Sequence, residues 1–331
     1  MIVALELAGA FVLIVGGAIW FTNAVEWLGK RLDLGAGAVG ALLAAVGTAL
    51  PESIIPVVAL LNGGGGEQVE LAIGAIIGAP FMLATVAMVL VTVSSFLYRR
   101  RREQGSELTI EADATRRDLT FFLVLFPVGI AVGAVGVATP WRIAAAVLLL
   151  VGYGVYVRTT VKASGGAEDD ELRPLYMDTT KDDPPSSLQI ALQFIVSLAA
   201  IVGGAELFVT AIESIATSVG IPLIVLALIL APLATELPEK ANSVLWIRRG
   251  KDALAAGNIT GAMAFQATVP VALGLCVTSW ALDRYAVAAG VVALAGGAIA
   301  LWALPSGRGG LVPAAGWLVL FGGFLGYVTF A

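Results

Sequence analysis

The chain has 331 residues, of which 59% are hydrophobic and only 13% are charged, whereas soluble domains carry about 25% charged residues. At about 20 residues for each membrane-spanning helix, this length accommodates roughly ten spans and excludes a separate soluble catalytic domain. The chain has no His and one Cys, which excludes a His-based zinc site or triad and a disulfide framework. Its net charge of −5 is small, so we expect no nucleic-acid partner.

The apolar segments predict an all-α membrane protein, because lipid admits unclosed backbone only as helices. The first runs from the N-terminus to about Trp27 with no Lys or Arg before it, so we predict a retained helix rather than a signal peptide. Nine more follow, at 36–61, 68–97, 119–138, 143–158, 188–214, 221–247, 252–278, 284–303 and 311–330. Polar stretches at 99–118 and 159–187 interrupt this series.

An internal repeat divides the chain into two five-helix halves, residues 1–158 and 188–331, joined by an acidic linker at 159–187. A shift of 187 residues aligns ten identities, among others, without a gap. In the first half they are Gly16, Gly17, Ala18, Phe21, Ala24, Glu26, Thr48, Leu50, Pro51 and Glu52. Five spans is an odd number, so the two halves must insert with opposite orientation. Such inverted repeats are typical of secondary transporters.

Positive charge predicts the orientation of the chain in the membrane. Sixteen of the 19 Lys and Arg residues fall in loops on one side, and only Arg142 and Arg284 fall on the other. Because cytoplasmic loops collect Lys and Arg, we predict an integral plasma-membrane protein with both termini outside. The remaining base, Lys240, lies inside a predicted span.

An intramembrane carboxylate marks the predicted functional site. Residues 47–52 read Gly-Thr-Ala-Leu-Pro-Glu and place Glu52 about halfway along a span, where insertion scales give a penalty of roughly 2.5–3.5 kcal/mol. Thr48 shares a helix face with Glu52, and Pro51 leaves a carbonyl without its helical donor. Hard cations prefer such oxygens. The alternative for a single copy is a helix kink with a snorkelling acid.

The second half repeats the arrangement at 234–239, which read Ala-Thr-Glu-Leu-Pro-Glu, and Pro232 adds another break. Opposite insertion would bring the two copies face to face, which favours an ion site over two kinks. This copy has an extra acid, Glu236, and Lys240 follows Glu239 directly. Because Glu at i and Lys at i+4 share a helix face, we predict that Lys240 pairs with Glu236 and leaves Glu239 free for an ion. The alternative is that Lys240 snorkels towards Arg248.

Other acids are less specific. Glu26 and Glu213 repeat but fall near helix ends, which indicates interfacial positions. Glu206 is deep enough either to line a cavity or to form a local ion pair. The acidic run at 168–171 lacks the Gly and the spacing of an EF-hand, so we interpret it as a solvated linker rather than a calcium sensor.

Two Gly-rich elements, at 74–80 and 257–262, have small residues four apart, which is typical of close helix packing. In the second half, Asn258, Gln266 and Thr268 add polar groups to the span. The first half offers no such group at these positions. The two halves are therefore predicted to be chemically unequal.

These motifs resemble the cation/calcium exchanger superfamily, which contains sodium/calcium and proton/calcium exchangers. Its repeats read approximately G-T-S-x-P-E, followed by G-N-x-x-G-S-N-x-x-N/D. The chain is similar at 47–52 with 74–83, and at 234–239 with 257–266. The resemblance covers nearly the whole chain. It implies a ten-helix, inverted-repeat antiporter whose two motif glutamates bind the ions, helped by the motif threonines and backbone carbonyls.

The chain also departs from that pattern. Ala49, Ala79 and Ala262 replace serines, and Leu83 and Gln266 occupy the Asn/Asp places. Glu236 stands where the second repeat normally has Ser, which gives a third carboxylate. The predicted cation-binding set is Glu52, Glu239, Thr48, Thr235, Glu236 and Gln266.

The leading hypothesis is an antiporter that exports calcium, or a related divalent cation, in exchange for sodium or protons. Monovalent cation/proton exchange is the nearest alternative. An intramembrane enzyme with paired carboxylates would not need an inverted repeat, and a scaffold would not need buried acids. We expect no enzymatic activity and no cofactor. The expected partners are membrane lipids and the transported ions.

Overall fold

The computed structural model describes residues 2–31, 50–61, 65–163, 172–178, 185–219, 222–250, 252–307 and 310–330. Within these ranges every regular element is helical and no strand occurs. Eight segments are long and apolar enough to cross a membrane: Val3–Phe21, Gly66–Leu97, Ala112–Val135, Thr139–Ala163, Ser187–Ile212, Ala255–Val277, Arg284–Ser306 and Leu311–Phe330. The prediction of an all-α membrane protein is confirmed.

The N-terminal part of the chain contains four of these eight segments and the shorter helix α4. They are α1 (Ile2–Arg31), α4 (Leu50–Leu61), a composite span of α5 (Gly66–Met82), the π-helical turn η2 (Leu83–Ala87) and α6 (Met88–Leu97), then α7 (Ala112–Val135) and α8 (Thr139–Ala163). The second half contains α9 (Ser187–Val219), α10 (Leu223–Thr235), α11 (Leu237–Arg248), α12 (Asp252–Gln266), α13 (Val269–Val277), α14 (Arg284–Ala303), the 3-10 turn η3 (Leu304–Ser306) and α15 (Leu311–Phe330).

Several predicted boundaries differ from the structure. The segment predicted at 221–247 is divided into α10 and α11, and most of the segment predicted at 36–61 lies outside the described residues. Helix α7 begins at Ala112, inside the stretch predicted as a loop at 99–118. Hydropathy sets this boundary too late because the first turns of α7 are charged. Similarly, α8 continues past the predicted start of the linker.

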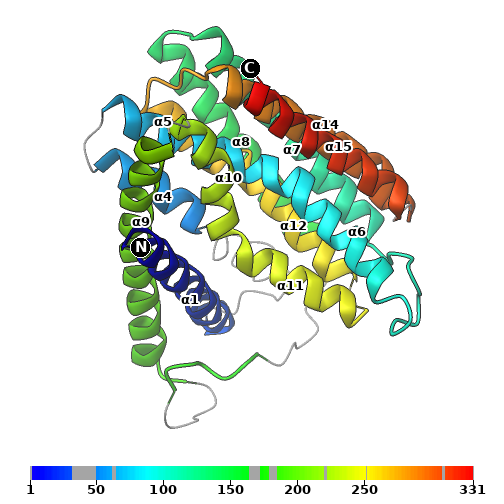
Figure 1. Ribbon diagram of the computed structural model, residues 1–331. Coiled ribbons are helices and arrows are strands. Elements are labelled where there is room, and N and C mark those ends of the chain that lie inside the picture. The colour runs from blue at the N-terminus through cyan, green and yellow to red at the C-terminus, as the bar shows by residue number, and fades with distance from the viewer. Residues whose placement is uncertain are drawn as a thin grey trace.

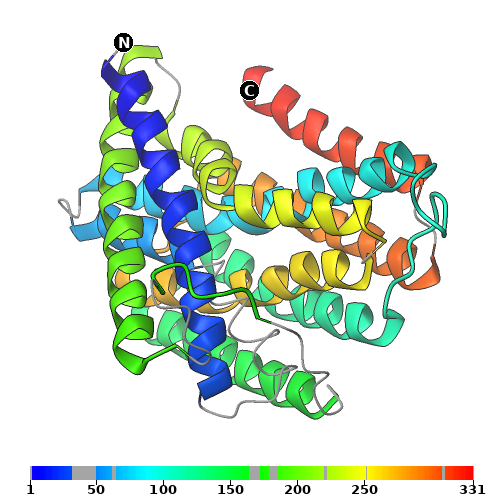
Figure 2. The same cartoon turned by 90° about the horizontal axis from the view of Figure 1, so that it is seen from below.

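Helices α1 and α9 lie side by side at one edge of the bundle, and several of the other helices run across their direction (Figures 1 and 2). Glycines let the two helices approach closely. A Cβ on Gly17 would lie 2.9 Å from the Ile201 side chain, and one on Gly204 would lie 2.8 Å from Ile14. Both the glycines and the isoleucines are 187 positions apart. The contact is therefore reciprocal between repeat-equivalent residues.

Helix α5 lies in the core, with every residue from Leu71 to Met82 buried, and it packs against α10. A Cβ on Gly78 would lie only 2.4 Å from the Leu228 carbonyl oxygen. That carbonyl has lost its usual helical donor, because Pro232 has no N–H. The prediction of close packing is confirmed for this Gly-rich element.

The equivalent element of α12 has fewer close neighbours among the described atoms. No described atom lies within 4 Å of a Cβ placed on Gly257, and the nearest to one on Gly261 is the Tyr156 hydroxyl at 3.5 Å. Gly261 is nonetheless buried, and because these distances cover the described atoms only, close packing of this element stays a prediction.

The described part of the linker, residues 172–178, packs on the bundle rather than extending into solvent. The Trp27 indole donates a 2.9 Å hydrogen bond to the Arg173 carbonyl. Leu175 is buried in a small cluster with Trp27. The apolar residues of this stretch therefore find a surface on α1 and α9. The acidic run at 168–171 lies outside the described residues.

Candidate functional site

The break between α10 and α11 falls at Glu236, inside the second motif. Its backbone departs from helical geometry (φ −88°, ψ 3°), yet its N–H still donates to the Pro232 carbonyl at 3.0 Å. The Lys240 N–H in turn donates to the Glu236 carbonyl at 3.0 Å. Pro238 has no N–H, so the carbonyl of Ala234 has no helical donor. The two prolines therefore flank a break that lies between them.

Glu236 and Lys240 form a buried ion pair. The Lys240 ammonium donates to Glu236 Oε2 at 2.5 Å, and the two side chains are 5% and 0% exposed. The predicted pairing is confirmed, and snorkelling of Lys240 towards the interface is not observed. The second carboxylate oxygen, Glu236 Oε1, has no hydrogen-bond partner among the described residues.

A second break lies between α12 and α13, directly after Gln266. Ala267 and Thr268 interrupt the helix, and the Thr268 hydroxyl donates to the Ala264 and Phe265 carbonyls, both at 2.9 Å. This hydroxyl caps the end of α12. The Gln266 amide is fully buried and approaches the Glu236 carboxylate. Neither its oxygen nor its nitrogen makes a hydrogen bond of standard geometry within the described ranges.

The remaining predicted ligands are only partly described. Thr48 lies outside the described residues. Glu52 lies in the first turn of α4, Thr235 ends α10, and Glu239 lies in the first turn of α11, but their side chains lie outside what the structure describes. Helix α4 packs against α5, and α11 packs in the same way against α12. The described side chains include no group of three Asp, Glu or Cys that could hold a metal ion.

The polar motif residue Asn258 joins α12 to α11. Its amide donates to the Ser243 hydroxyl at 3.4 Å, and that hydroxyl lies 3.5 Å from the Ala255 carbonyl. Ser243 is one turn beyond Lys240. Asn258 therefore helps to fix the position of α11, the helix that carries Lys240.

The first half is less polar at the equivalent position. Leu83, which is equivalent to Gln266, begins the π-helical turn η2, so both halves are irregular at this point. The Thr85 hydroxyl is buried and donates to the Phe81 carbonyl at 2.7 Å. The predicted chemical inequality of the halves is confirmed for these residues.

A buried carboxylate that the sequence analysis missed is Asp118. It accepts hydrogen bonds from Thr260 at 2.8 Å and from Tyr156 at 3.2 Å, which join α7 to α12 and α8. The neighbouring Arg117 guanidinium lies 3.7 Å away. A helical signal was present, because the buried positions of α7 recur every three or four residues from Thr115 onwards.

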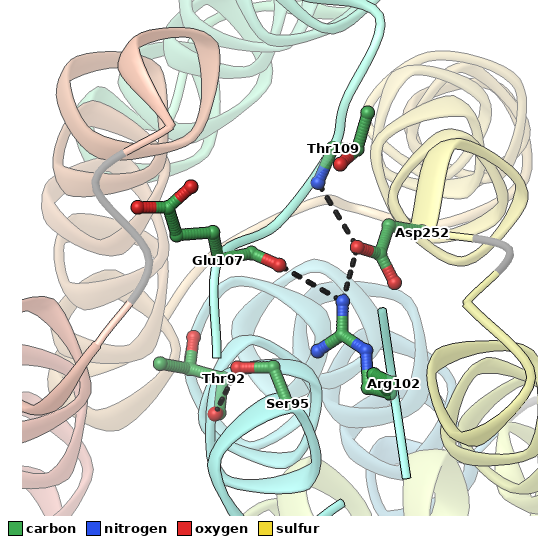
Figure 3. Close-up of polar contacts among 6 residues, drawn as sticks. All are labelled: Thr92, Ser95, Arg102, Glu107, Thr109 and Asp252. Atoms are coloured by element: carbon green, nitrogen blue, oxygen red, sulfur yellow. Dashed lines mark hydrogen bonds and ion pairs between the residues drawn. The ribbon is translucent and has the colours of Figure 1, made fainter. Parts of the chain in front are cut away.

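A second buried ion pair joins the loop between α6 and α7 to the first turn of α12 (Figure 3). The Arg102 guanidinium donates to Asp252, whose same oxygen accepts the Thr109 N–H at 2.9 Å. Arg102 also donates to the Glu107 carbonyl at 2.9 Å. Both side chains are fully buried. This pair was not predicted from the sequence.

Among the other predicted acids, Glu206 joins neither pair. Glu206 lies on an exposed face of α9, so the structure does not support cavity lining. The side chains of Glu26 and Glu213 lie outside the described set. A pocket of about 550 Å³ lies at the start of α5 and the end of α13, and the residues that line it include Glu70 and Asp283.

Comparison with known proteins identifies the family. A match to the sodium/calcium exchanger protein family covers residues 2–162 and 189–330. An uncharacterised membrane protein of Methanocaldococcus jannaschii is 26% identical over 251 residues, which are 76% of this chain and 74% of that protein.

Two solved structures share the fold. The crystal structure of the H+/Ca2+ exchanger CAX has a TM-score of 0.77 at 19% identity, covering 99% of this chain and 82% of that one. The sodium-calcium exchanger NCX_Mj has a TM-score of 0.61 at 18% identity, covering 99% and 98%. Because the family match spans most of the sequence, this chain belongs to the sodium/calcium exchanger protein family, a family of membrane cation antiporters rather than enzymes.

Proposed function

We propose that this protein exports calcium, or a related divalent cation, in exchange for sodium or protons. The observation that carries this proposal is the buried Glu236 carboxylate at one helix break, with the Gln266 amide beside it at another. Discontinuous helices that meet inside the membrane are the usual ion sites of secondary transporters. The solved exchangers named above support calcium as the divalent ion.

The proposed ion-binding residues are Glu52, Glu239, Thr48, Thr235, Glu236 and Gln266. One motif glutamate comes from each half, and together they would offset the dehydration of a divalent cation. Hydroxyl, amide and carbonyl oxygens would complete its coordination. No organic cofactor is needed, because the gradient of the second ion supplies the driving force.

The proposed architecture is ten spans in two inverted repeats, residues 1–158 and 188–331, joined by the linker at 159–187. Two observations support it. The contact between α1 and α9 is reciprocal, since Gly17 meets Ile201 as Gly204 meets Ile14. In addition, α4 packs on α5 as its repeat equivalent α11 packs on α12. Such pairwise correspondence is expected when two halves share one fold around a two-fold axis.

The proposed location is the plasma membrane, with both termini outside. The Lys and Arg bias between loops supports it. Single-Cys labelling on a Cys276→Ser background tests it, since Cys276 is exposed and must be removed first. A Cys introduced at Ser106 should react with an impermeant reagent only after the cells are opened. Reaction in intact cells would reverse the orientation of every span.

The function is tested by calcium uptake into proteoliposomes under an imposed sodium or pH gradient. Glu52→Gln and Glu239→Gln should each abolish uptake while the protein remains folded, because the amide keeps size and removes only the charge. Glu206→Gln, on the exposed face of α9, is the matched control and should transport at the wild-type rate. Sodium/proton exchange without any calcium flux would favour the monovalent alternative.

A further inference from the structure

Lys240 is unusual because it is a charged base inside a predicted span. It is almost fully buried, and its ammonium contacts Glu236, four residues earlier in the chain. Ionisable residues within membrane spans are rare, and they are associated with ion or substrate pathways. The position of this base therefore needs an explanation beyond helix formation.

The ion pair does not join separate parts of the fold. Glu236 and Lys240 are four residues apart, so their contact spans one turn across the break between α10 and α11. Replacing a buried ion pair by neutral residues of similar size is often neutral for stability. We therefore do not expect this pair to hold the helix bundle together.

The pair is also incompletely satisfied on one side. Lys240 contacts Oε2 of Glu236, while Oε1 has no partner in the described part of the chain. The Gln266 amide approaches this carboxylate, and neither its oxygen nor its nitrogen has a hydrogen-bond partner of standard geometry among the described residues. Buried polar groups of native proteins are normally hydrogen-bonded, so unpartnered groups that converge are candidates for binding a ligand.

We propose that Lys240 is a tethered cation of the transport site. Its ammonium occupies one side of the Glu236 carboxylate, where a mobile monovalent cation would otherwise bind. Glu236 then presents its other oxygen, together with Gln266, to the transported ion. This inference rests on the proposed function and deepens it, because it identifies Lys240 as the residue that sets how many cationic charges the site accepts.

The charge balance follows directly. With Glu52, Glu239 and Glu236 in the site, three carboxylates would carry three negative charges. The fixed ammonium reduces the net charge to two, which matches a single divalent cation. Since buried charges interact strongly over several ångströms, removing either member of the pair should change divalent binding in opposite directions.

The test is direct binding of radioactive calcium to purified protein in detergent, at mildly alkaline pH and constant ionic strength. Lys240→Met removes the ammonium and should tighten calcium binding by about tenfold. Glu236→Gln leaves the ammonium without its partner and should weaken binding by about tenfold or more. The double variant Glu236→Gln/Lys240→Met restores the net charge and should bind within about threefold of wild type.

If the pair acts on the ion through its charge, the two single variants change calcium affinity in opposite directions, and the two changes cancel in the double variant. A purely structural pair would weaken binding in both single variants, and that result, or no change in Lys240→Met, would overturn the proposal. Because the double variant buries no unpaired charge, it also shows whether a loss in Glu236→Gln reflects misfolding.

The matched control is the other buried ion pair. Arg102→Met and Asp252→Asn also disrupt a buried pair, but in the loop and at the start of α12. Neither variant should tighten calcium binding. If Arg102→Met did so, the tightening in Lys240→Met could not be assigned to the position of Lys240 beside the ion. Wild-type protein that binds neither calcium nor sodium would count against the proposed function itself. If the wild type binds calcium but the two single variants do not change its affinity in opposite directions, only the tethered-cation inference is wrong.

Discussion

The two buried ion pairs contrast in what they connect. Glu236 and Lys240 are four residues apart at the break of one span. Arg102 and Asp252 are 150 residues apart and join a loop of the first half to a helix of the second. Only the second pair is tied to backbone groups of the same loop, through Thr109 and Glu107. A local pair tunes charge at one place, whereas a distant pair fixes the position of two segments.

Breaking the distant pair should have the largest effect on stability. Asp252→Ala leaves the Arg102 guanidinium buried without its counter-charge and removes the acceptor of the Thr109 N–H. Loss of one partner of a buried pair reduces the free energy of unfolding by about 3–5 kcal/mol. Thermal unfolding in detergent measures this. Arg102→Met combined with Asp252→Leu should recover much of the loss. A single-variant loss below about 1 kcal/mol, typical of exposed pairs, would make this contact dispensable.

The packing of α10, which ends directly before Glu236, offers the next test. Gly78→Ala places a methyl group 2.4 Å from the Leu228 carbonyl oxygen, so α5 and α10 must separate. Overpacking of this kind reduces the free energy of unfolding by about 1–3 kcal/mol. Calcium uptake should fall further than folding alone explains, because α10 carries the motif.

The matched control for this packing test is Gly154→Ala, at an exposed position of α8 with no described atom within 4 Å of the new Cβ. It should be neutral or stabilise by about 0.5–1 kcal/mol. Equal effects of the two alanines would refute the requirement for close approach at Gly78.

The contrast between the two pairs also explains what the sequence could predict. The local pair follows from the i, i+4 spacing of Glu236 and Lys240 and the low polarity of their span. The distant pair depends on how the loop after α6 folds back onto α12, and no local pattern encodes that path. The all-helical fold could be predicted from local sequence for a similar reason. In lipid, a long apolar segment satisfies its backbone hydrogen bonds by itself only as a helix.

Helix boundaries and breaks were harder to predict. Two prolines at 232 and 238 made the break in the second motif foreseeable, but its position at Glu236 depends on the hydrogen bonds that survive around it. Asp118 was assigned to a loop because charged neighbours lower the local hydropathy, although α7 begins six residues earlier. Burial of Asp118 depends on Thr260 and Tyr156, which are distant in sequence.

Asp118 lies on α7 and holds it to α12 through Thr260, and its loss should have an intermediate effect on stability. Asp118→Asn removes the charge that accepts the Thr260 and Tyr156 hydroxyl groups, and it forces an amide nitrogen to face a donor. Loss of a hydrogen bond to a charged group reduces stability by about 1.5–3 kcal/mol, and the remaining oxygen of Asn retains part of this. We expect a loss near the lower value by thermal unfolding. Asp118→Leu should be worse, and an unchanged melting temperature in both would show that the cluster does not hold α7 to α12.

Neutralising the local pair should have the smallest effect on stability. Glu236→Gln/Lys240→Met keeps the side-chain volumes and removes both charges, so no buried charge is left unpaired. Because the desolvation of two ions offsets most of their attraction, such replacements change the free energy of unfolding by about 0–1 kcal/mol or even stabilise the fold. The same melting assay used for Asp252→Ala measures this, and each single variant should be less stable than the double. If the double variant lost as much stability as Asp252→Ala, the local pair would also hold separate segments in place. The two pairs would then both be structural, and the contrast between them would fail.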